Sequence, residues 1–306
     1  TLMVTYTPSV TMEVDGYADA ILDAAGADLD YEIFRVGAAE YEENGALIPE
    51  EGFASFEKTH VLLKSPITTP LGTGFRSLNV TLRKKYDLYA NMRPAKSNAA
   101  VKTPFEHVDI VMFRENTEDL YAGVEEKIDE NTAHSIKIIT RKCSERIVRS
   151  AFDYAVKNKR KKVTCVHKAN IMKLSDGLFR DVFYEISREY PGIEAEDKIV
   201  DNVAMQLVMH PETFDVIVTE NLYGDILSDL TSGLIGGLGL LPSSNMGTDF
   251  AMFEAVHGSA PDIAGKGIAN PTAFLWSACM MLEHLGKQEI SAKIRRAVDE
   301  VLKDGT

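Results

Sequence analysis

Cysteine is scarce and scattered in this sequence, with Cys143, Cys165 and Cys279 the three cysteines among 306 residues. Neither a disulfide framework nor a zinc site is therefore indicated, and a reducing compartment fits best. Long apolar runs are also lacking, since none approaches the roughly 18 residues of a spanning helix, and no signal-peptide pattern opens the chain. We therefore expect no membrane association.

Positive charge is in deficit. The chain has 33 Lys and Arg against 46 Asp and Glu, a net charge of −13. This balance argues against binding nucleic acid, and the basic run 157–162 is explained as a helix end followed by a turn. An anionic small molecule would therefore need a local cluster of positive charge. No Gly-x-Gly-x-x-Gly follows a strand, so a Rossmann fingerprint is absent as well.

What the sequence does contain is alternation of strands and helices, which predicts an α/β fold with a mainly parallel sheet, and the length suggests about two domains. An exposed arm is expected at 124–142 and a proline-containing loop at 93–103, and Ser144 is expected to cap the helix that it begins. The principal strands are predicted at 60–64, 87–91, 108–113, 163–167 and 216–218. The principal helices are predicted at 77–85, 144–158, 272–284 and 291–303.

Two aspartates follow the strand at 216–218. Gly224 is expected to allow a turn into a helix, on which Asp225 and Asp229 lie one turn apart on the same face. Like charges at this spacing repel, and paired carboxylates suit a hard cation such as Mg²⁺ or Mn²⁺. The alternative is one aspartate favoured by the helix dipole and one that is solvated, which is the commoner explanation when spacing alone is considered.

Three arginines lie beside polar residues in loops or at element ends: Arg83, Arg93 and Arg114. Guanidinium groups bind carboxylates with two parallel hydrogen bonds, so several together would suit a di- or tricarboxylate. The alternative for each is a surface ion pair, which explains most arginines.

Six segments, in this order along the chain, resemble the β-decarboxylating dehydrogenases, the family of isocitrate, homoisocitrate and isopropylmalate dehydrogenases. The segments are SLNVTLR (77–83), DLYANMRP (87–94), RENTEDLYAG (114–123), HKANIMK (167–173), NLYGDILSD (221–229) and HGSAPDIAG (257–265). The resemblance covers about residues 60 to 285. It implies a larger domain from 1–90 and 232–306, and a smaller one from 91–231 that carries the arm and the dimer contacts.

The resemblance also implies roles for individual residues. Tyr121 would protonate carbon after CO₂ leaves, and Lys168 would exchange a proton with the substrate hydroxyl, a task that requires a lowered amine pKa. The three arginines would bind the substrate carboxylates. Asp225 and Asp229 would hold the metal together with Asp201 of the other subunit. The implied assembly is a homodimer or higher oligomer with shared active sites, in bacterial cytosol or mitochondrial matrix.

The implied reaction is the oxidative decarboxylation of isocitrate to 2-oxoglutarate. Ser77 and Asn79 resemble the polar pair of isocitrate dehydrogenases, although Ser77 could also cap a helix. Homoisocitrate, longer by one methylene, and isopropylmalate are the alternative substrates.

The implied cofactor is NAD. Relatives that use NADP place a lysine and a tyrosine where this chain has Asp262 and Ile263, and an aspartate favours ribose hydroxyls over a 2′-phosphate. The set of residues implied for cofactor binding is Asn170, Glu254, His257, Gly258, Ser259, Ala260, Asp262, Ile263 and Asn270.

One segment departs from the family. Family members have a glycine-rich loop near the start, whereas Tyr6 to Glu13 here contains no glycine, and this difference should alter the path of the loop near the cofactor. It motivates a second hypothesis, a non-catalytic regulatory subunit of a hetero-oligomeric isocitrate dehydrogenase. The presence of Tyr121, Lys168 and the three aspartates argues against that hypothesis.

Overall fold

A computed structural model describes residues 1–6, 10–67, 77–258, 260, 263 and 266–304. The chain forms two compact units. The first comprises residues 1–82, 98–103 and 236–306, and the second comprises 83–97 and 104–235. The chain passes from one to the other inside α4 (Leu78–Lys85), the helix predicted at 77–85.

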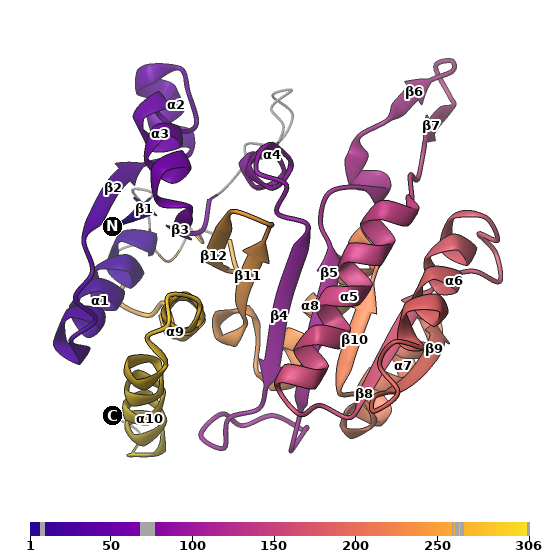
Figure 1. Cartoon of the computed structure of the whole chain (residues 1–306). Helices are drawn as coiled ribbons and strands as arrows, with labels where there is room; N and C mark the ends of the chain where they lie inside the picture. The colour runs from indigo at the N-terminus through magenta and orange to yellow at the C-terminus, as the bar shows by residue number, and fades with distance from the viewer. Residues whose placement is uncertain (7–9, 68–76, 259, 261–262, 264–265, 305–306) are drawn as a thin grey trace. The chain divides into compact units, whose positions relative to one another are not determined.

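The first unit is built on a sheet with strand order β2-β1-β3-β12-β11 among the described residues (Figure 1). All neighbours in it are parallel except β11 and β12, which pair antiparallel. Its strands are β1 (Leu2–Tyr6), β2 (Tyr31–Arg35), β3 (Val61–Lys64), β11 (Pro242–Met246) and β12 (Ala251–Ala255). Its helices are α1 (Val10–Ala25), α2 (Ala38–Asn44), α3 (Glu50–Thr59), η3 (Leu238–Leu240), α9 (Thr272–His284) and α10 (Gln288–Asp304).

Helix α9 forms the core of the first unit. It is apolar around most of its circumference and nearly all of its residues are buried, as expected for a helix enclosed on every side. It packs against β3, β11 and β12, and α1 and α10 pack against it. Its bounds are those predicted from the sequence, whereas α10 begins at Gln288, three residues before its predicted start.

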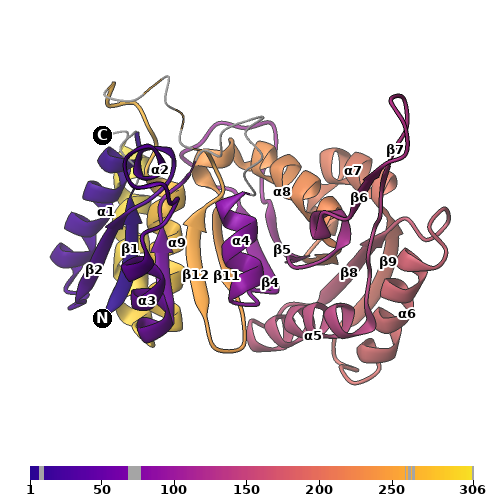
Figure 2. The same cartoon turned by 90° about the horizontal axis from the view of Figure 1, so that it is seen from above.

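The second unit has the strand order β4-β5-β10-β8-β9, with all neighbours parallel except β4 and β5. Helices α5 and α6 lie on one face of this sheet, and α7 and α8 lie on the other (Figure 2). The strands are β4 (Ala90–Lys96), β5 (Asp109–Glu115), β8 (Lys162–His167), β9 (Glu194–Ile199) and β10 (Val216–Thr219). The helical elements are η1 (Asp119–Ala122), α5 (Arg141–Lys157), α6 (Ser175–Ser187), α7 (Val200–Met209), η2 (Pro211–Thr213) and α8 (Asn221–Ile235).

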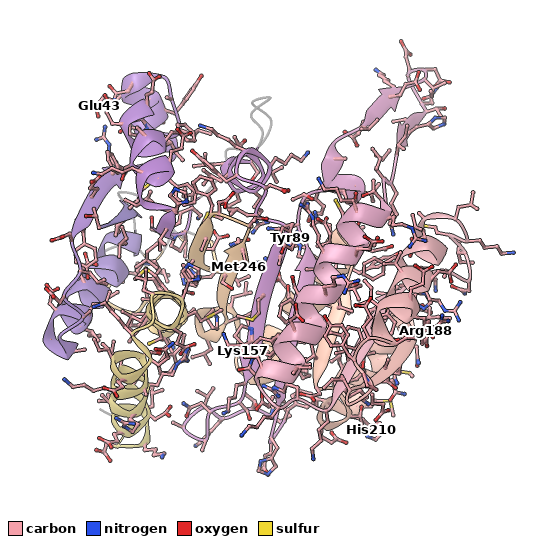
Figure 3. The ribbon with its side chains drawn as sticks, viewed as in Figure 1. Glu43, Tyr89, Lys157, Arg188, His210 and Met246 are labelled. Atoms are coloured by element: carbon pink, nitrogen blue, oxygen red, sulfur yellow. The ribbon has the colours of Figure 1, made fainter. Side chains whose placement is uncertain are left out.

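Two local predictions in this unit are wrong. The strand predicted at 87–91 begins at Ala90 and continues through Pro94 to Lys96, because proline is accommodated opposite Val111 in the antiparallel pair with β5. Helix α5 begins before Ser144, since Thr140 is its N-cap and accepts the Cys143 N–H at 3.2 Å. The helix ends at Lys157, labelled in Figure 3.

An exposed hairpin projects from the second unit between η1 and α5 (Figure 1). Its strands β6 (Glu125–Lys127) and β7 (Ala133–Ser135) pair antiparallel, and each of their residues is exposed. The arm is shorter than the predicted 124–142, because residues 137–139 are partly buried and α5 begins at Arg141. We call residues 124–136 the arm from here on. Among the described residues, no helix is both long enough and apolar enough to cross a membrane.

Candidate active site

The second unit gathers polar side chains at one edge of its sheet. Because β5, β10, β8 and β9 are parallel, their carboxyl ends meet at the same edge, where α/β proteins bind ligands. Arg114 lies near the end of β5, and Lys168 directly follows β8. Helix α8 follows β10, and Asp201 lies in the first turn of α7 after β9. Residues far apart in sequence are thereby placed at a common edge.

Asp225 and Asp229 lie one turn apart on α8, and a single arginine reaches both. The Nη1 atom of Arg93 lies 3.7 Å from Asp225 Oδ1 and 4.0 Å from Asp229 Oδ1. The same nitrogen donates to Ser228 Oγ at 2.5 Å, so α8 and β4 are joined beside the two carboxylates. The arginine side chain is 5% exposed, whereas the aspartates are 42% and 59% exposed. The carboxylates are therefore open on one side and faced by a buried cation on the other.

Asp225 is also the meeting point of Arg114 and Tyr121. Arg114 donates to one carboxylate oxygen and the Tyr121 hydroxyl donates to the other at 2.6 Å. The Arg114 guanidinium lies 5.0 Å from the centre of the Tyr121 ring, within the range of a cation–π contact. Arg93, Arg114 and Tyr121 thus converge on Asp225. Two of the three arginines predicted to bind substrate, and the residue predicted to protonate the substrate carbon, therefore meet at one predicted metal ligand.

Charge and burial divide the two aspartates. Burial disfavours ionisation of Asp225, but Arg114, Tyr121 and Arg93 outweigh it and hold its pKa below the usual value. At Asp229 burial dominates over the attraction of Arg93, and the negative charge of Asp225 adds to it, so the pKa is raised. Asp225 is therefore the better anion of the pair.

The same environment acts on Tyr121 and Arg114. Burial, followed by the hydrogen bond to Asp225, raises the pKa of Tyr121, so the hydroxyl keeps its proton until a strong base appears. Burial, followed by the positive charge of Arg83, lowers the pKa of Arg114. A cluster of cations gains from binding an anion with several carboxylates.

Gly224 has a different role from the predicted one. Helix α8 begins at Asn221, so Gly224 lies inside the helix rather than in a turn before it. A Cβ atom at this position would lie 2.5 Å from Arg114 Cγ and 2.7 Å from Arg114 Cβ. Glycine is therefore required for the close approach of α8 to β5, which also lets Asn221 Oδ1 accept from Arg114 Nε at 2.9 Å.

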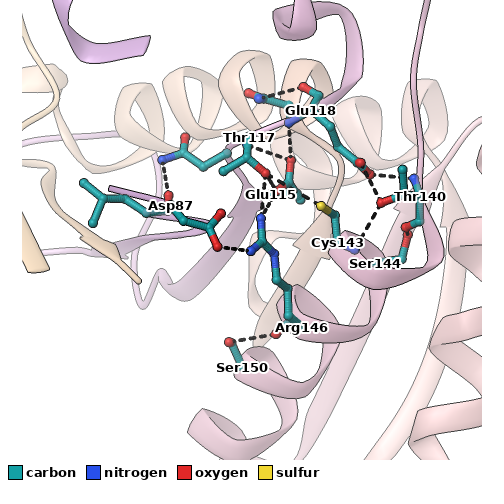
Figure 4. Close-up of polar contacts among 12 residues, drawn as sticks. Asp87, Glu115, Thr117, Glu118, Thr140, Cys143, Ser144, Arg146 and Ser150 are labelled. Atoms are coloured by element: carbon teal, nitrogen blue, oxygen red, sulfur yellow. Dashed lines mark hydrogen bonds and ion pairs between the residues drawn. The ribbon is translucent and has the colours of Figure 1, made fainter. Parts of the chain in front are cut away.

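The turn that carries Tyr121 is held by acidic residues for which we predicted no role. Glu115 accepts the N–H groups of Thr117 and Glu118 at 2.8 and 2.9 Å (Figure 4). Glu118 accepts both the N–H and the hydroxyl of Thr140, each at 2.8 Å, and so ties the turn to the start of α5. Burial raises the pKa of Glu115 against these hydrogen bonds. The acidic residues within RENTEDLYAG were the sequence feature that could have indicated this role. The structure shows that their carboxylates accept hydrogen bonds from backbone N–H groups.

Asp119 connects the turn to α8. Its backbone is left-handed, with φ of 70°, and its side chain accepts the N–H of Leu120 at 2.7 Å and of Leu222 at 2.8 Å. Leu222 belongs to the first turn of α8, whose N–H groups have no partner within the helix and favour an anion. One carboxylate therefore fixes the turn of Tyr121 against the helix of Asp225.

Lys168 and Asp201 pair with each other. The Lys168 ammonium donates to Asp201, whose carboxylate is 70% exposed, and this hydrogen bond lowers the pKa of Asp201. Within one chain, the described residues contain no group of three or more His, Cys, Asp or Glu side chains arranged to hold a metal. Asp201 is thus not brought together with Asp225 and Asp229 inside one chain.

The predicted substrate-specificity and cofactor residues lie mainly in the first unit. Asn79 is on α4, and its Oδ1 is buried without a hydrogen-bond partner among the described residues, while the Ser77 carbonyl accepts the Thr81 N–H. Asn270 Oδ1 accepts the Thr272 N–H at 2.9 Å at the start of α9. The Ile263 N–H donates to the Ala260 carbonyl at 3.2 Å, and Gly258 is exposed. Asn170, in the second unit, is also exposed.

Glu254 and His257 are less open to solvent. Glu254 is buried, and its carboxylate lies 2.7 Å from the Lys64 ammonium and accepts from Asn245 at 3.0 Å. Burial, with a smaller contribution from Lys64, lowers the pKa of His257. Ser259, Asp262 and part of the altered loop, residues 7–9, lie outside the described residues; Val10 to Glu13 belong to α1.

The donor set fits a divalent metal in part. Asp225 and Asp229 offer hard oxygen ligands one turn apart, and each ionised carboxylate keeps further acceptor positions when an arginine binds it. Two carboxylates leave coordination positions for substrate oxygens and for one more protein ligand.

Sequence comparison agrees with this geometry. The family model of isocitrate/isopropylmalate dehydrogenase matches residues 7–306, and the chain belongs to this family. It is 47% identical to the probable isocitrate dehydrogenase [NAD] subunit alpha, mitochondrial, of Drosophila melanogaster, over 96% of this chain and 78% of that protein. It is 50% identical to the isocitrate dehydrogenase [NADP] of Thermus thermophilus, over 93% of this chain but 58% of the longer relative.

Structural comparison gives the same family. The crystal structure of isocitrate dehydrogenase from Methylococcus capsulatus superposes with a TM-score of 0.95 at 50% identity, covering 100% of this chain and 92% of the other. The predicted α/β fold with a mainly parallel sheet is confirmed. Relatives of similar identity are named as NAD and as NADP enzymes, so the comparisons agree on isocitrate and differ on the cofactor.

Proposed function

We propose that this chain catalyses the metal-dependent oxidative decarboxylation of isocitrate to 2-oxoglutarate and CO₂, with reduction of NAD. The observation that carries the proposal is the convergence of Arg93, Arg114 and Tyr121 on Asp225, with Asp229 one turn away. Cations for substrate carboxylates, oxygen ligands for a metal and a protonated hydroxyl therefore lie together around Asp225.

Substrate binding is assigned to the arginines. With a net charge of −13 the protein as a whole repels a trianion, so attraction must come from Arg83, Arg93 and Arg114. Arg93 and Arg114 are buried and already face carboxylates, and charge-assisted hydrogen bonds of this type contribute about 1.5–3 kcal/mol each. Ser77 and Asn79 are assigned to the carboxylate that distinguishes isocitrate from isopropylmalate.

Proton transfer is assigned to Tyr121 and Lys168. Tyr121 keeps its proton and donates it in a hydrogen bond to Asp225, so a proton is held beside the metal ligands for delivery to the substrate carbon from which CO₂ departs. Lys168 exchanges the proton of the substrate hydroxyl. A divalent metal held by Asp225 and Asp229, and by Asp201 of a second copy, would polarise the hydroxyl and the ketone that replaces it.

NAD is the proposed cofactor rather than NADP. The sequence has Asp262 and Ile263 where NADP-dependent family members carry a lysine and a tyrosine, and an aspartate repels a 2′-phosphate. The identity of those two residues supports NAD. Glu254, His257 and Asn270, with 258–260, are proposed to line the nucleotide.

The proposed assembly is a homodimer that shares its active sites. Helices α7 and α8 pack against each other and expose Met205, Val208, Met209 and Ile226, each about half accessible. Exposed apolar side chains on two packed helices favour burial against a second protein surface. Lys168 and Asp201 belong to the same part of the chain, and we assign them to the partner's active site. Three free thiols fit a reducing compartment, bacterial cytosol or mitochondrial matrix.

A steady-state comparison tests the substrate and the cofactor. The purified chain is assayed with Mn²⁺ and each of isocitrate, homoisocitrate and isopropylmalate, with NAD and with NADP. We expect kcat/KM to be highest for isocitrate with NAD, by about tenfold or more over homoisocitrate. A preference for another acid refutes the substrate, and a preference for NADP refutes the cofactor. No turnover except with an added partner subunit would favour the regulatory alternative.

A further inference from the structure

Lys137 lies where the arm returns to the body of the second unit, two residues beyond β7. Its ammonium donates to Asp176 at 2.7 Å and also pairs with Glu220. The side chains of these two carboxylates are 0% and 1% exposed, and that of Lys137 is 12% exposed. Enclosed carboxylates require such a cation, because an unpaired buried charge is strongly unfavourable.

Asp176 connects this ion pair to the loop that follows β8. One of its oxygens faces Lys137, and the other accepts the backbone N–H of Lys168 at 2.7 Å. The Lys168 carbonyl in turn accepts the N–H groups of Ile171 and Met172, each at 2.9 Å. Asp176 therefore holds the peptide group from which the Lys168 side chain extends.

We propose that Lys137 is a positioning residue for Lys168, acting through Asp176. The inference rests on the proposed role of Lys168 in proton transfer. Lys137 connects the base of the arm to Lys168, a group that reacts with substrate. The residues that follow Lys137 contact the turn of the second proton-transfer group. The Ile138 carbonyl accepts the Asp119 N–H at 2.8 Å, on the turn that carries Tyr121. The segment 137–140 therefore contacts the supports of both proton-transfer groups.

Loss of the Lys137 ammonium would leave Asp176 and Glu220 without their shared cation. Burial raises the pKa of Glu220 well above its usual value even though Lys137 opposes this, and Asp176 adds to the rise. Without the ammonium, repulsion between the two carboxylates, or protonation of one, would shift Asp176 and weaken its bond to the Lys168 N–H. The Lys168 amine would then occupy a wider range of positions.

Three variants test the inference. Lys137→Met removes the charge, and Lys137→Arg restores a cation that can donate to Asp176. Glu220→Gln is the matched control, because Glu220 is the other partner of Lys137, whereas Asp176 is the carboxylate that accepts the Lys168 N–H. Each variant is measured for kcat and KM with isocitrate, and for hydrogen exchange of the Lys168 amide.

We expect Lys137→Met to lower kcat about 10- to 100-fold with KM within about threefold, since the chemical step depends on placement to within an ångström. Exchange of the Lys168 amide should accelerate by about tenfold or more. Lys137→Arg should recover most of both losses, and Glu220→Gln should change neither. Unchanged exchange in Lys137→Met, an arginine no better than methionine, or equal effects of Glu220→Gln would each overturn the inference.

Two provisions keep the result decisive. If circular dichroism shows that Lys137→Met does not fold, Asp176→Asn replaces it, and unaltered exchange of the Lys168 amide there would overturn the inference. Amide exchange does not depend on turnover. If the wild-type chain cannot oxidise isocitrate but Lys137→Met accelerates exchange of the Lys168 amide, the proposed function alone is refuted. If the wild-type chain is active and Lys137→Met leaves this exchange unchanged, the positioning role alone is refuted.

Discussion

Replacing Gly224 with alanine tests the packing on which the site depends. The added Cβ would lie 2.5 Å from Arg114 Cγ, 2.7 Å from its Cβ and 3.1 Å from its Cδ. These atoms belong to the buried stem of the arginine, so relief requires α8 or β5 to move. Overpacking of this kind costs about 1–3 kcal/mol, and the better helix propensity of alanine offsets about 0.5–1 kcal/mol of it. We expect a net loss of stability of about 1–2 kcal/mol.

Gly233 supplies the matched control within the same helix. A Cβ there has no neighbour within 4 Å, so Gly233→Ala should be neutral or stabilising by up to about 1 kcal/mol. Gly224→Ala should lower Tm by roughly 2–4 °C for each kcal/mol of lost stability, measured by thermal melts at one protomer concentration. Displacement of Arg114 should also reduce kcat/KM for isocitrate, by roughly 10- to 150-fold if one charge-assisted hydrogen bond is lost. Equal stability and activity of the two variants would refute the close approach of α8 to Arg114.

Three further predictions concern single side chains. Asp225→Asn should lower Mn²⁺ affinity and turnover together, by more than about tenfold each, and isothermal titration that finds unchanged Mn²⁺ affinity would remove Asp225 from the metal site. Thr140→Ala should cost about 1 kcal/mol or more in urea unfolding, because it removes the α5 cap and the hydroxyl bond to Glu118, and a larger loss in Ser144→Ala would contradict the assigned cap. For Asp197, burial raises the pKa, but Tyr184, His167 and Arg180 outweigh it and lower the folded value. Its stabilisation is therefore present above the unfolded pKa of about 3.9 and lost as pH falls through the folded value. The stability difference between wild type and Asp197→Asn, measured by melts at pH 6 and pH 3, should shrink at the lower pH. A constant difference would exclude the contacts of the ionised Asp197 carboxylate as its source.

Local pattern was sufficient for elements whose own residues determine them. The apolar run 216–218 became β10, and the helix at 272–284 has its predicted bounds because nearly every side chain in it is apolar or small. The spacing of Asp225 and Asp229 also fixed their common face, since a helix places residues four apart on one side.

Features that depend on distant contacts could not be predicted in the same way. Pro94 is in a strand because β5 pairs with it, and Gly224 is needed because Arg114, 110 positions earlier in the sequence, lies against it. The link from Lys137 to Lys168 runs through a buried aspartate on α6. No spacing rule connects such residues, because only the folded sheet brings the ends of its strands together.

Mixing two inactive variants tests the shared active site most directly. Lys168→Met keeps Tyr121 and Asp225, and Asp225→Asn keeps Lys168, so a mixed dimer would contain one site with every residue intact. Random reassociation of equal amounts after mild denaturation makes half of the dimers mixed, and we expect isocitrate oxidation to recover to about a quarter of the wild-type rate. Recovery to no more than the sum of the two separate variants would contradict the account, because each site would then lie within a single chain.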